Sequence, residues 1–464
     1  MAKYKAYPEY KDSGVEWLGE IPEHWKLSKL RYQFFFNKGL TITKEHLQEE
    51  GIPCVNYGEV HSKYGFEVDP EIHTLKCVSD KYLKETSNAL LAKGDIVFAD
   101  TSEDIDGSGN FTQLVSDTVT FAGYHTIIAR PFERDCCRFY AYLLDCKELR
   151  SQVRHAVKGV KVFSITQSIL RNLSIWLPSK DEQAQIAVFL DHETAKIDNL
   201  IEKQQQLIEL LKEKRQAVIS HAVTKGLNPD VPMKDSGVEW LGEVPKHWLC
   251  TKIKYVSALT PKKLNINLGM NDECTFIPME KLKRNSLITD EIKSIREVIN
   301  GYTYFEDNDL LVAKVTPCFE NKNIAVASGL MNGIGFGSTE IYVLRPDNNI
   351  GVNYLLYRLQ EDNFMRAATG AMTGAGGLKR VPSDFLLNYP IAIPLKPEMD
   401  AIAIYLNEQE ARYELMENNV IRAVQLMQER RIALISAAVT GKIDVRDWRA
   451  PDAQKTEEPQ EVTI

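Results

Sequence analysis

Two stretches of the sequence combine basic side chains with a complete lack of acidic ones, and they are residues 149–180 and 363–383. Both also contain glycine. Glycine lets a backbone approach a phosphate closely, and lysine or arginine neutralises the phosphate charge. The stretches therefore predict contacts to a nucleic-acid backbone, and the alternative is a solvated basic face. The candidate phosphate ligands are Arg150, Arg154, Lys158, Lys161, Arg366, Lys379 and Arg380.

A polar loop precedes each basic stretch and follows an apolar run that predicts a buried strand. Residues 100–110 follow the run at 96–99, and residues 314–323 follow the corresponding run at 310–313. The two runs match, whereas the two loops are unlike each other. Loops that vary on a repeated scaffold are typical of recognition, although drift in solvated turns would also produce the difference. The candidate recognition side chains in these loops are Ser102, Asn110, Lys314, Asn321, Lys322 and Asn323.

These loops occur twice because almost the whole chain is duplicated. Residues 11–25 and 234–248 share the sequence KDSGVEWLGE and are identical at 13 of 15 positions. A second pair of segments, 178–224 and 394–440, aligns without a gap at an offset of 216 residues. The globular stretches between them, 26–177 and 249–393, read as mixed α/β, with short strand-like runs separated by turns.

The segments at 178–224 and 394–440 predict two long amphipathic helices, each about 60 Å in length. A Ser-x-x-Glu capping box at Ser179 marks the start of the first. Positions spaced alternately four and three apart form a coiled-coil seam, which we expect to pair within the chain, with oligomerisation as the alternative. The first seam is Ile186, Leu190, Glu193, Ile197, Leu200, Gln204, Leu207, Leu211, Lys214, Val218 and His221. The second is Ile402, Leu406, Gln409, Tyr413, Met416, Val420, Ala423, Met427, Arg430, Leu434 and Ala437.

Composition restricts the class of protein. The 464 residues are 44% hydrophobic and 26% charged, as in a globular protein of two or more domains. No apolar run is long enough for a membrane span, and no signal region follows Met1, so we expect a cytoplasmic protein. A net charge of -8 argues against indiscriminate binding to nucleic acid. The eight cysteines lack the spacing of a zinc site or a disulfide framework.

Recognisable catalytic motifs are missing. The chain lacks the Asn/Asp-Pro-Pro-aromatic tetrapeptide of amino-methyltransferases, and the glycines at 333–337 do not open a helix after a strand. Residues 439–443 lack the spacing of a phosphate-binding P-loop. His24 and His247 suggest a metal site, but neither has a ligand partner at useful spacing, so we expect the adjacent tryptophans to anchor a turn instead. The chain is therefore predicted to be non-catalytic.

Together these motifs resemble the specificity subunits of type I restriction-modification enzymes. The resemblance rests on the repeated KDSGVEWLGE motif, the helix start LPSKDEQAQIA, the two helix ends with Ala-Val-Thr, and the loop strings FADTSED and KVTPCFENKN. It implies duplicated α/β (α+β) target-recognition domains, related by a pseudo-twofold axis and separated by an antiparallel pair of long coiled-coil helices. Each domain would read one half of a bipartite site in double-stranded DNA, with the candidate residues given above in contact with bases and phosphates.

The resemblance also implies partners. Two modification subunits would bind S-adenosylmethionine and methylate adenine, and restriction subunits would use ATP and Mg to translocate and cut DNA, so that no cofactor is expected in this chain. The second helix departs from the pattern, because Glu398-Met399 stands where the first has Glu182-Gln183. The alternatives are a coiled-coil adaptor without sequence-specific DNA binding and a stand-alone DNA-modifying enzyme.

The repeat and the resemblance predict six segments. They are a first target-recognition domain with its N-terminal motif (1–177), a first spacer helix (178–224), a linker with the repeated motif (225–248), a second target-recognition domain (249–393), a second spacer helix (394–441) and a C-terminal tail, expected to be disordered (442–464).

Overall fold

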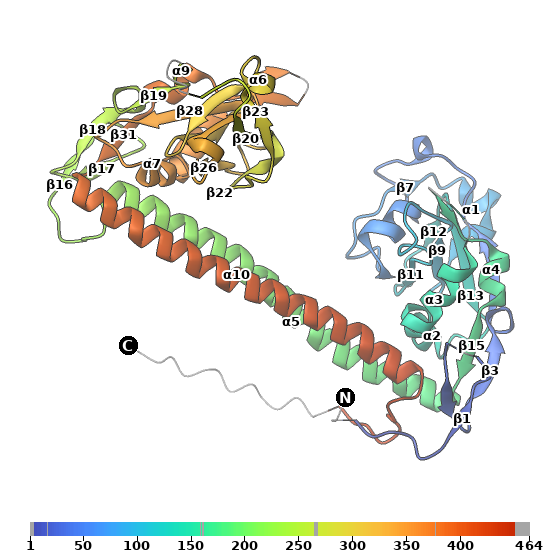
Figure 1. The fold of residues 1–464 in the computed structure, drawn as a ribbon. Helices are drawn as coiled ribbons and strands as arrows, with labels where there is room; N and C mark the ends of the chain where they lie inside the picture. The colour runs from blue at the N-terminus through green and yellow to red at the C-terminus, as the bar shows by residue number, and fades with distance from the viewer. Residues whose placement is uncertain are drawn as a thin grey trace. The chain divides into compact units, whose positions relative to one another are not determined.

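The computed structural model describes residues 4–15, 17–157, 159, 162–263, 268–375 and 377–450. The chain forms two compact units. The first unit comprises Met1–Lys203 and Ala423–Ile464, and the second comprises Gln204–Arg422. Figure 1 shows their elements coloured along the chain. Both units mix β-sheet with helix, as the sequence predicts.

Two larger sheets and a helical layer form most of the first unit. Its five-stranded sheet has the order β4 (Phe34–Lys38), β13 (Thr126–Pro131), β9 (Ile96–Ala99), β11 (Phe111–Leu114) and β6 (Phe66–Val68). Its four-stranded sheet has the order β7 (Cys77–Val78), β5 (Ile52–Val55), β12 (Thr120–Ala122) and β8 (Leu90–Leu91). The helices α2 (Cys137–Asp145) and α3 (Lys147–Ala156) follow β13.

Strand β9 is buried on both faces, which explains why its sequence is a continuous apolar run. Ile96 and Phe98 lie in the core that includes α2, whereas Val97 and Ala99 lie in a separate core with strands of the four-stranded sheet. Successive side chains of a strand point to opposite faces, so a strand covered on both faces needs apolar residues at every position.

The second unit contains sheets of closely similar order. One is β19 (Ser257–Leu259), β28 (Ile341–Pro346), β25 (Leu310–Ala313) and β26 (Ile324–Val326). The other is β23 (Ile292–Ser294), β20 (Glu273–Ile277), β27 (Ile334–Gly337) and β24 (Thr303–Glu306). This second sheet also has the same strand directions as the four-stranded sheet of the first unit. In each sheet the two inner strands are parallel to each other, and each outer strand is antiparallel to its neighbour. Helices α7 (Val352–Arg358) and α8 (Asp362–Gly370) follow β28.

Each long helix is continuous, α5 from Lys180 to Lys225 and α10 from Lys396 to Val439. In the first unit, Ile186 and Leu190 of α5 share a core with Leu434 and Ile435 of α10. In the second unit, residues near the end of α5 share a core with residues near the start of α10; they are Ile219, Ala222, Val223, Met399, Ile402 and Leu406. Each unit is therefore a sheet domain joined to parts of both helices.

The predicted seam of α5 is wrong at four positions. Leu200, Leu207, Lys214 and His221 are exposed, and in each case the following residue is less exposed. Those following residues are Ile201, Ile208, Arg215 and Ala222. These less exposed residues are also seven positions apart, so the seven-residue repeat continues, with these four seam positions displaced by one residue. The predicted seam of α10 is exposed only at Arg430.

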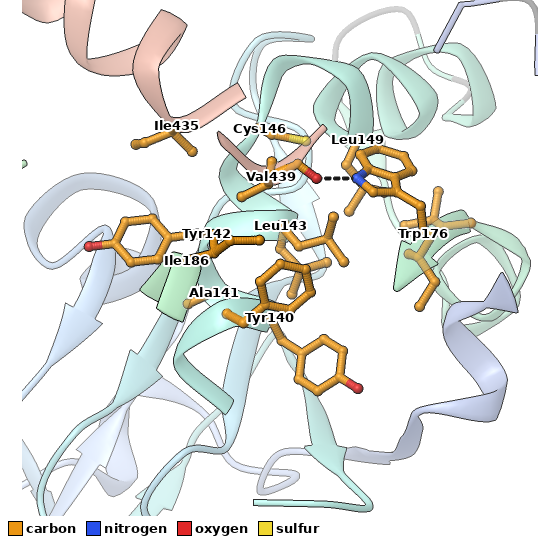
Figure 2. Close-up of a cluster of buried hydrophobic side chains, with 14 of the residues drawn as sticks. Tyr140, Ala141, Tyr142, Leu143, Cys146, Leu149, Trp176, Ile186, Ile435 and Val439 are labelled. Atoms are coloured by element: carbon orange, nitrogen blue, oxygen red, sulfur yellow. Dashed lines mark hydrogen bonds between the residues drawn. The ribbon is translucent and has the colours of Figure 1, made fainter. Parts of the chain in front are cut away.

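Helix α10 is fixed to the sheet domain of the first unit through a buried tryptophan. The indole Nε1 of Trp176, in β15 (Ser174–Leu177), donates a hydrogen bond to the carbonyl oxygen of Val439 (Figure 2). Leu149, Ile186 and Ile435 belong to the same core (Figure 2). The far end of the chain therefore completes the core of its first domain.

The expectation of a disordered C-terminal tail is wrong for residues 442–450. Ile443 and Val445 are buried, and Trp448 packs edge-on against Phe189 of α5 with ring centroids 5.2 Å apart. Gln185 of α5 also donates to the carbonyl oxygen of Trp448 at 2.8 Å. Apolar side chains at alternate positions from 443 to 445 explain the docking. Residues 451–464 lie outside the described residues. None of the described helices has the length and apolar character that a membrane span requires.

Candidate nucleic-acid interface

In the first unit, strand pairing joins the polar loop 100–110 to the acid-free stretch. Strand β10 (Thr101–Ser102) is antiparallel to β14 (Phe163–Ser164), and Thr101 faces Ser164. The backbone N–H of Ile165 also donates to the carbonyl oxygen of Asp100 at 2.8 Å. Two segments that are about 60 positions apart in the sequence therefore form one surface.

The second unit joins its corresponding segments in the same way. Val315 forms an antiparallel bridge with Arg380, and Thr316 N–H donates to the carbonyl oxygen of Lys379 at 3.0 Å. Lys379 belongs to an exposed hairpin of β29 (Thr373–Ala375) and β30 (Leu378–Arg380). Gly377, with a φ of 81°, turns this hairpin in a backbone conformation that glycine adopts without steric cost. The hairpin explains the run of glycines in the sequence.

Side chains of the first-unit interface are largely bound to one another. The hydroxyl of buried Ser102 donates to the carbonyl oxygen of Asp104 at 2.6 Å. Arg150 donates to Asn110 Oδ1 at 3.0 Å and forms an ion pair with Asp145 at 3.1 Å. These three candidate residues therefore order the loop, and their direct contact with DNA stays a prediction.

Acidic side chains of the same loop also shape its charge. Arg154 lies 3.6 Å from Asp106, so part of the positive charge of the basic stretch is neutralised within the protein. Glu103 and Asp104 reinforce the effect of burial, which raises the pKa of nearby Tyr57. Lys158 and Lys161, the remaining candidates of this stretch, lie outside the described residues.

Several residues at this interface were missed in the sequence. A polar groove of about 470 Å³ lies beside β10 and is lined by Lys38, Asp100, Thr126, Ile165 and Gln167, among others. His61 stacks on Tyr57 with ring centroids 5.4 Å apart, and its carbonyl oxygen accepts a hydrogen bond from Asn110 at 3.4 Å. Lys38 and His61 stand alone in the sequence, far from both predicted segments, so no local pattern marks them.

The candidates of the second unit differ in how far they are free to reach a ligand. Asn321, Arg366 and Lys379 are exposed, and Asn323 is partly exposed. Arg380 forms two 2.8 Å hydrogen bonds with the carboxylate of Glu340, and this pairing lowers the pKa of Glu340. Lys314 lies over the ring of Tyr342, 5.1 Å from its centroid.

Lys322, a predicted recognition residue, is held by groups of its own unit. Its ammonium group donates to Gln216 of α5, to the carbonyl oxygen of Gln360 at 3.1 Å and to Asp362 at 3.4 Å. Desolvation in this setting lowers the pKa of Lys322. The side chain therefore ties the loop 314–323 to the helix and does not project outward.

The histidines of the repeated motif contact the long helices. Glu182 of α5 accepts hydrogen bonds from His24 Nε2 at 2.9 Å and from the indole of buried Trp25 at 3.1 Å. In the second unit, Glu398 of α10 accepts from His247 at 2.6 Å and from Trp248 at 3.1 Å. Among the described residues, no three His, Cys, Asp or Glu side chains gather as a metal-binding group.

Comparisons with known proteins agree on one family. The family model of the type I restriction modification DNA specificity domain matches residues 22–210. The specificity subunit of the type I restriction enzyme EcoAI from Escherichia coli is 36% identical over 191 residues, which are 40% of this chain and 32% of that protein. The chain thus spans about a third of that relative's length. The putative MjaX specificity subunit from Methanocaldococcus jannaschii is 24% identical over 442 residues, which are 92% of this chain and 96% of that protein.

The fold of a solved structure is also similar. A chain from work on complex assembly and conformational transition of the type I R-M system superimposes with a TM-score of 0.67 at 15% identity, covering 91% of this chain and 99% of that one. The resemblance inferred from the repeated motifs is therefore confirmed. Residues 22–210 match the DNA specificity domain of type I restriction-modification enzymes, and the chain is similar to their specificity subunits over nearly its whole length.

Proposed function

We propose that the chain is the DNA-recognition subunit of a type I restriction-modification enzyme, in which each unit reads one half of a bipartite double-stranded target. One observation carries the proposal. In both units a variable polar loop is joined by backbone pairing to an acid-free segment, at β10 and β14 and at Val315 and Arg380. This pairing supports a single surface that carries both base-reading and phosphate-binding groups, which recognition of a duplex requires.

The exposed cations of the second unit suit a phosphate backbone. Lys379 and Arg366 are exposed on the hairpin and on α8, and no acidic residue occurs between them in the sequence. Exposed Asn321 lies in the loop bonded to this hairpin, and an amide side chain can pair with the major-groove edge of adenine. The net charge of -8 is thus compatible with a local surface for DNA.

The spacer in this proposal is an antiparallel pairing of α5 with α10. In the first unit, Arg431 of α10 forms an ion pair with Asp198 of α5 at 2.9 Å. In the second unit, Arg215 of α5 lies 3.4 Å from Glu417 of α10. Contacts move backward along α10 as they move forward along α5, which supports the antiparallel direction. The two arginines are 216 positions apart, which supports a duplicated, twofold arrangement.

Matched apolar positions on the helices suggest where the modification subunits bind. Val188 and Leu426 are exposed in the first unit, and their counterparts at the 216-residue offset, Ile404 and Leu210, are exposed in the second. Exposed apolar side chains repeated in this way are typical of protein interfaces. We assign one modification subunit to each pair. Those subunits would bind S-adenosylmethionine, and restriction subunits would bind ATP and Mg. In this proposal the chain itself is a non-catalytic member of the complex, and the complex acts in the cytoplasm.

The proposal is tested by DNA binding of the complex with its modification subunits. We expect tighter binding to the host's methylated target sequence than to a scrambled duplex of equal length. Equal affinity for both duplexes would mean that the chain is an adaptor without sequence readout. DNA modification by the purified chain alone would instead mean that it is a stand-alone enzyme.

The variant Lys379→Gln is expected to weaken binding to the target and to the scrambled duplex by the same factor. The slope of log affinity against log salt concentration should fall by about one, because one phosphate contact is lost. Fluorescence anisotropy titrations at several salt concentrations measure both quantities. Lys246→Gln is the matched control, since Lys246 is an exposed lysine of the same unit outside the interface. A salt slope equal to that of the control would exclude Lys379 as a phosphate ligand.

Lengthening the spacer is expected to separate the half-sites. Four residues, about one helical turn, are inserted between Leu200 and Leu211 and between the matching Met416 and Met427. The helices grow by about 6 Å, so the gap between half-sites should increase by about two base pairs. Methylome sequencing measures the gap. A control that substitutes four exposed residues without changing helix length should keep it, and an unchanged gap in the longer variant would remove the spacer role.

A further inference from the structure

An open apolar groove lies on the second unit beside the end of α5. Its volume is about 600 Å³, and it is lined by Ala217, Val218, His221, Leu227, Pro229 and Tyr405, among others. Leu227 is 42% exposed within it. The residues of the linker at 226–229 form one wall, and Tyr405 of α10 contributes from the other helix.

The first unit contains the same positions, but there they are covered. At the offset of 216 residues, Phe189 corresponds to Tyr405, Leu434 to Val218 and Ile443 to Leu227. Phe189 is fully buried and Ile443 is 3% exposed. Since the residue types match in size and apolar character, the difference between the units comes from what covers the groove.

Two aromatic side chains from the chain's own ends cover the groove of the first unit. The rings of Trp448 and Tyr4 both pack edge-on against Phe189, at centroid distances of 5.2 and 5.4 Å. The hydroxyl of Tyr4 donates to Glu193 at 3.0 Å. Two segments, 4–10 and 442–448, lie in this unit where the second unit has the single linker 226–232. The second unit is therefore short of one aromatic-bearing segment.

From this difference we propose that the groove of the second unit binds an extended, aromatic-bearing segment of the modification subunit assigned to that unit. The inference rests on the proposed function for the identity of the partner. Buried aromatic rings contribute large apolar areas to an interface, and edge-to-face packing adds to the gain. Gln409, which corresponds to Glu193, places an amide where the first unit has the acceptor for a tyrosine hydroxyl. Residues 451–464 of this chain contain no aromatic residue, so they do not supply the ring.

Blocking the groove tests the proposal through stoichiometry. Ala217→Arg places a long charged side chain in the groove, and Ala217 is exposed, so the fold should be retained. Ala433→Arg is the matched control, because Ala433 is also exposed and occupies the corresponding position in the first unit, where the neighbouring Phe189, Leu434 and Ile443 are already buried. Native mass spectrometry of complexes with purified modification subunit should give two modification subunits for the unchanged chain and for Ala433→Arg, and one for Ala217→Arg.

Binding of a peptide tests the groove independently of the modification subunit. The labelled probe has the sequence of residues 4–10, YKAYPEY, and is titrated into the full chain. We expect saturable binding that Ala217→Arg weakens at least tenfold and Ala433→Arg leaves unchanged. Two modification subunits on Ala217→Arg, or peptide binding unaffected by it, would overturn the proposal. So would a dimer of the chain alone that Ala217→Arg dissociates, because the occupant would then be a second copy. If the unchanged chain binds no modification subunit, the proposed function fails, and the peptide titration still decides whether the groove binds an aromatic segment.

Discussion

Exchanging residues 26–177 for the same region of a relative is expected to change one half of the methylated DNA target and to leave the other half unchanged. The region contains both segments of the first-unit interface, since β10 and β14 lie within it. It also contains the groove that includes Lys38 and Gln167. A whole interface is therefore transferred, and methylome sequencing of the host reads both half-sites in one measurement.

The reciprocal exchange provides the control. Replacing residues 249–393 transfers the loop 314–323 together with the β29–β30 hairpin, so the other half of the target should change. A donor region that retains tryptophan at position 176 preserves the hydrogen bond to Val439. Alteration of both half-sites by a single exchange would contradict the model of two independent readers.

The variant Trp176→Ala is expected to lower the free energy of unfolding of the first unit by about 3–5 kcal/mol. Trp176 is fully buried and donates to the carbonyl oxygen of Val439, so the substitution removes both packing and a hydrogen bond to α10 (Figure 2). Calorimetry should show a lower transition temperature for the first unit and an unchanged one for the second. Phe132→Ala is the control, because Phe132 is 60% exposed in the same unit, and an equal effect of both substitutions would show that Trp176 does not join the helix to the sheet.

Much of the fold could be predicted because its signals are local and occur twice. The runs at 96–99 and 310–313 are apolar at every position, and both become strands covered on two faces. The long helices follow from seams that each span 36 positions, within helices of 46 and 44 residues. The two acid-free segments could also be identified, because a lack of acidic residues over about 20 to 30 positions is visible without any structure.

Individual site residues could not be predicted, because the partner of a side chain depends on tertiary contacts. Lys322 looks like a recognition residue in its loop, yet Gln216 and Gln360, which bind it, are more than 30 positions away. Arg150 likewise donates a hydrogen bond to Asn110 and forms an ion pair with Asp145. The seam of α5 was displaced for a different reason: apolar residues stand at both of two adjacent positions, as at Leu200-Ile201 and Leu207-Ile208, so the pattern alone does not show which one is less exposed.

The docking of residues 442–450 was missed because a short polar segment with three apolar residues resembles a tail. Ile443, Val445 and Trp448 gain their apolar contacts from α5 and from the first residues of the chain, which lie more than 200 positions earlier. Sequence alone gives no indication of that surface. The comparison of the two units shows it directly, since the linker 226–232 leaves the corresponding surface open.

The division of the first unit between Met1–Lys203 and Ala423–Ile464 sets an order for biosynthesis. The second unit is one uninterrupted stretch, so a ribosome can release it in a form able to fold while α10 is still being made. In the first unit, Trp176, Phe189 and Ile186 remain uncovered until residues 434–448 have been translated. A nascent chain stalled before Val439 would consequently expose apolar core residues of the first unit to chaperones and proteases, even though residues 1–203 had already been synthesised.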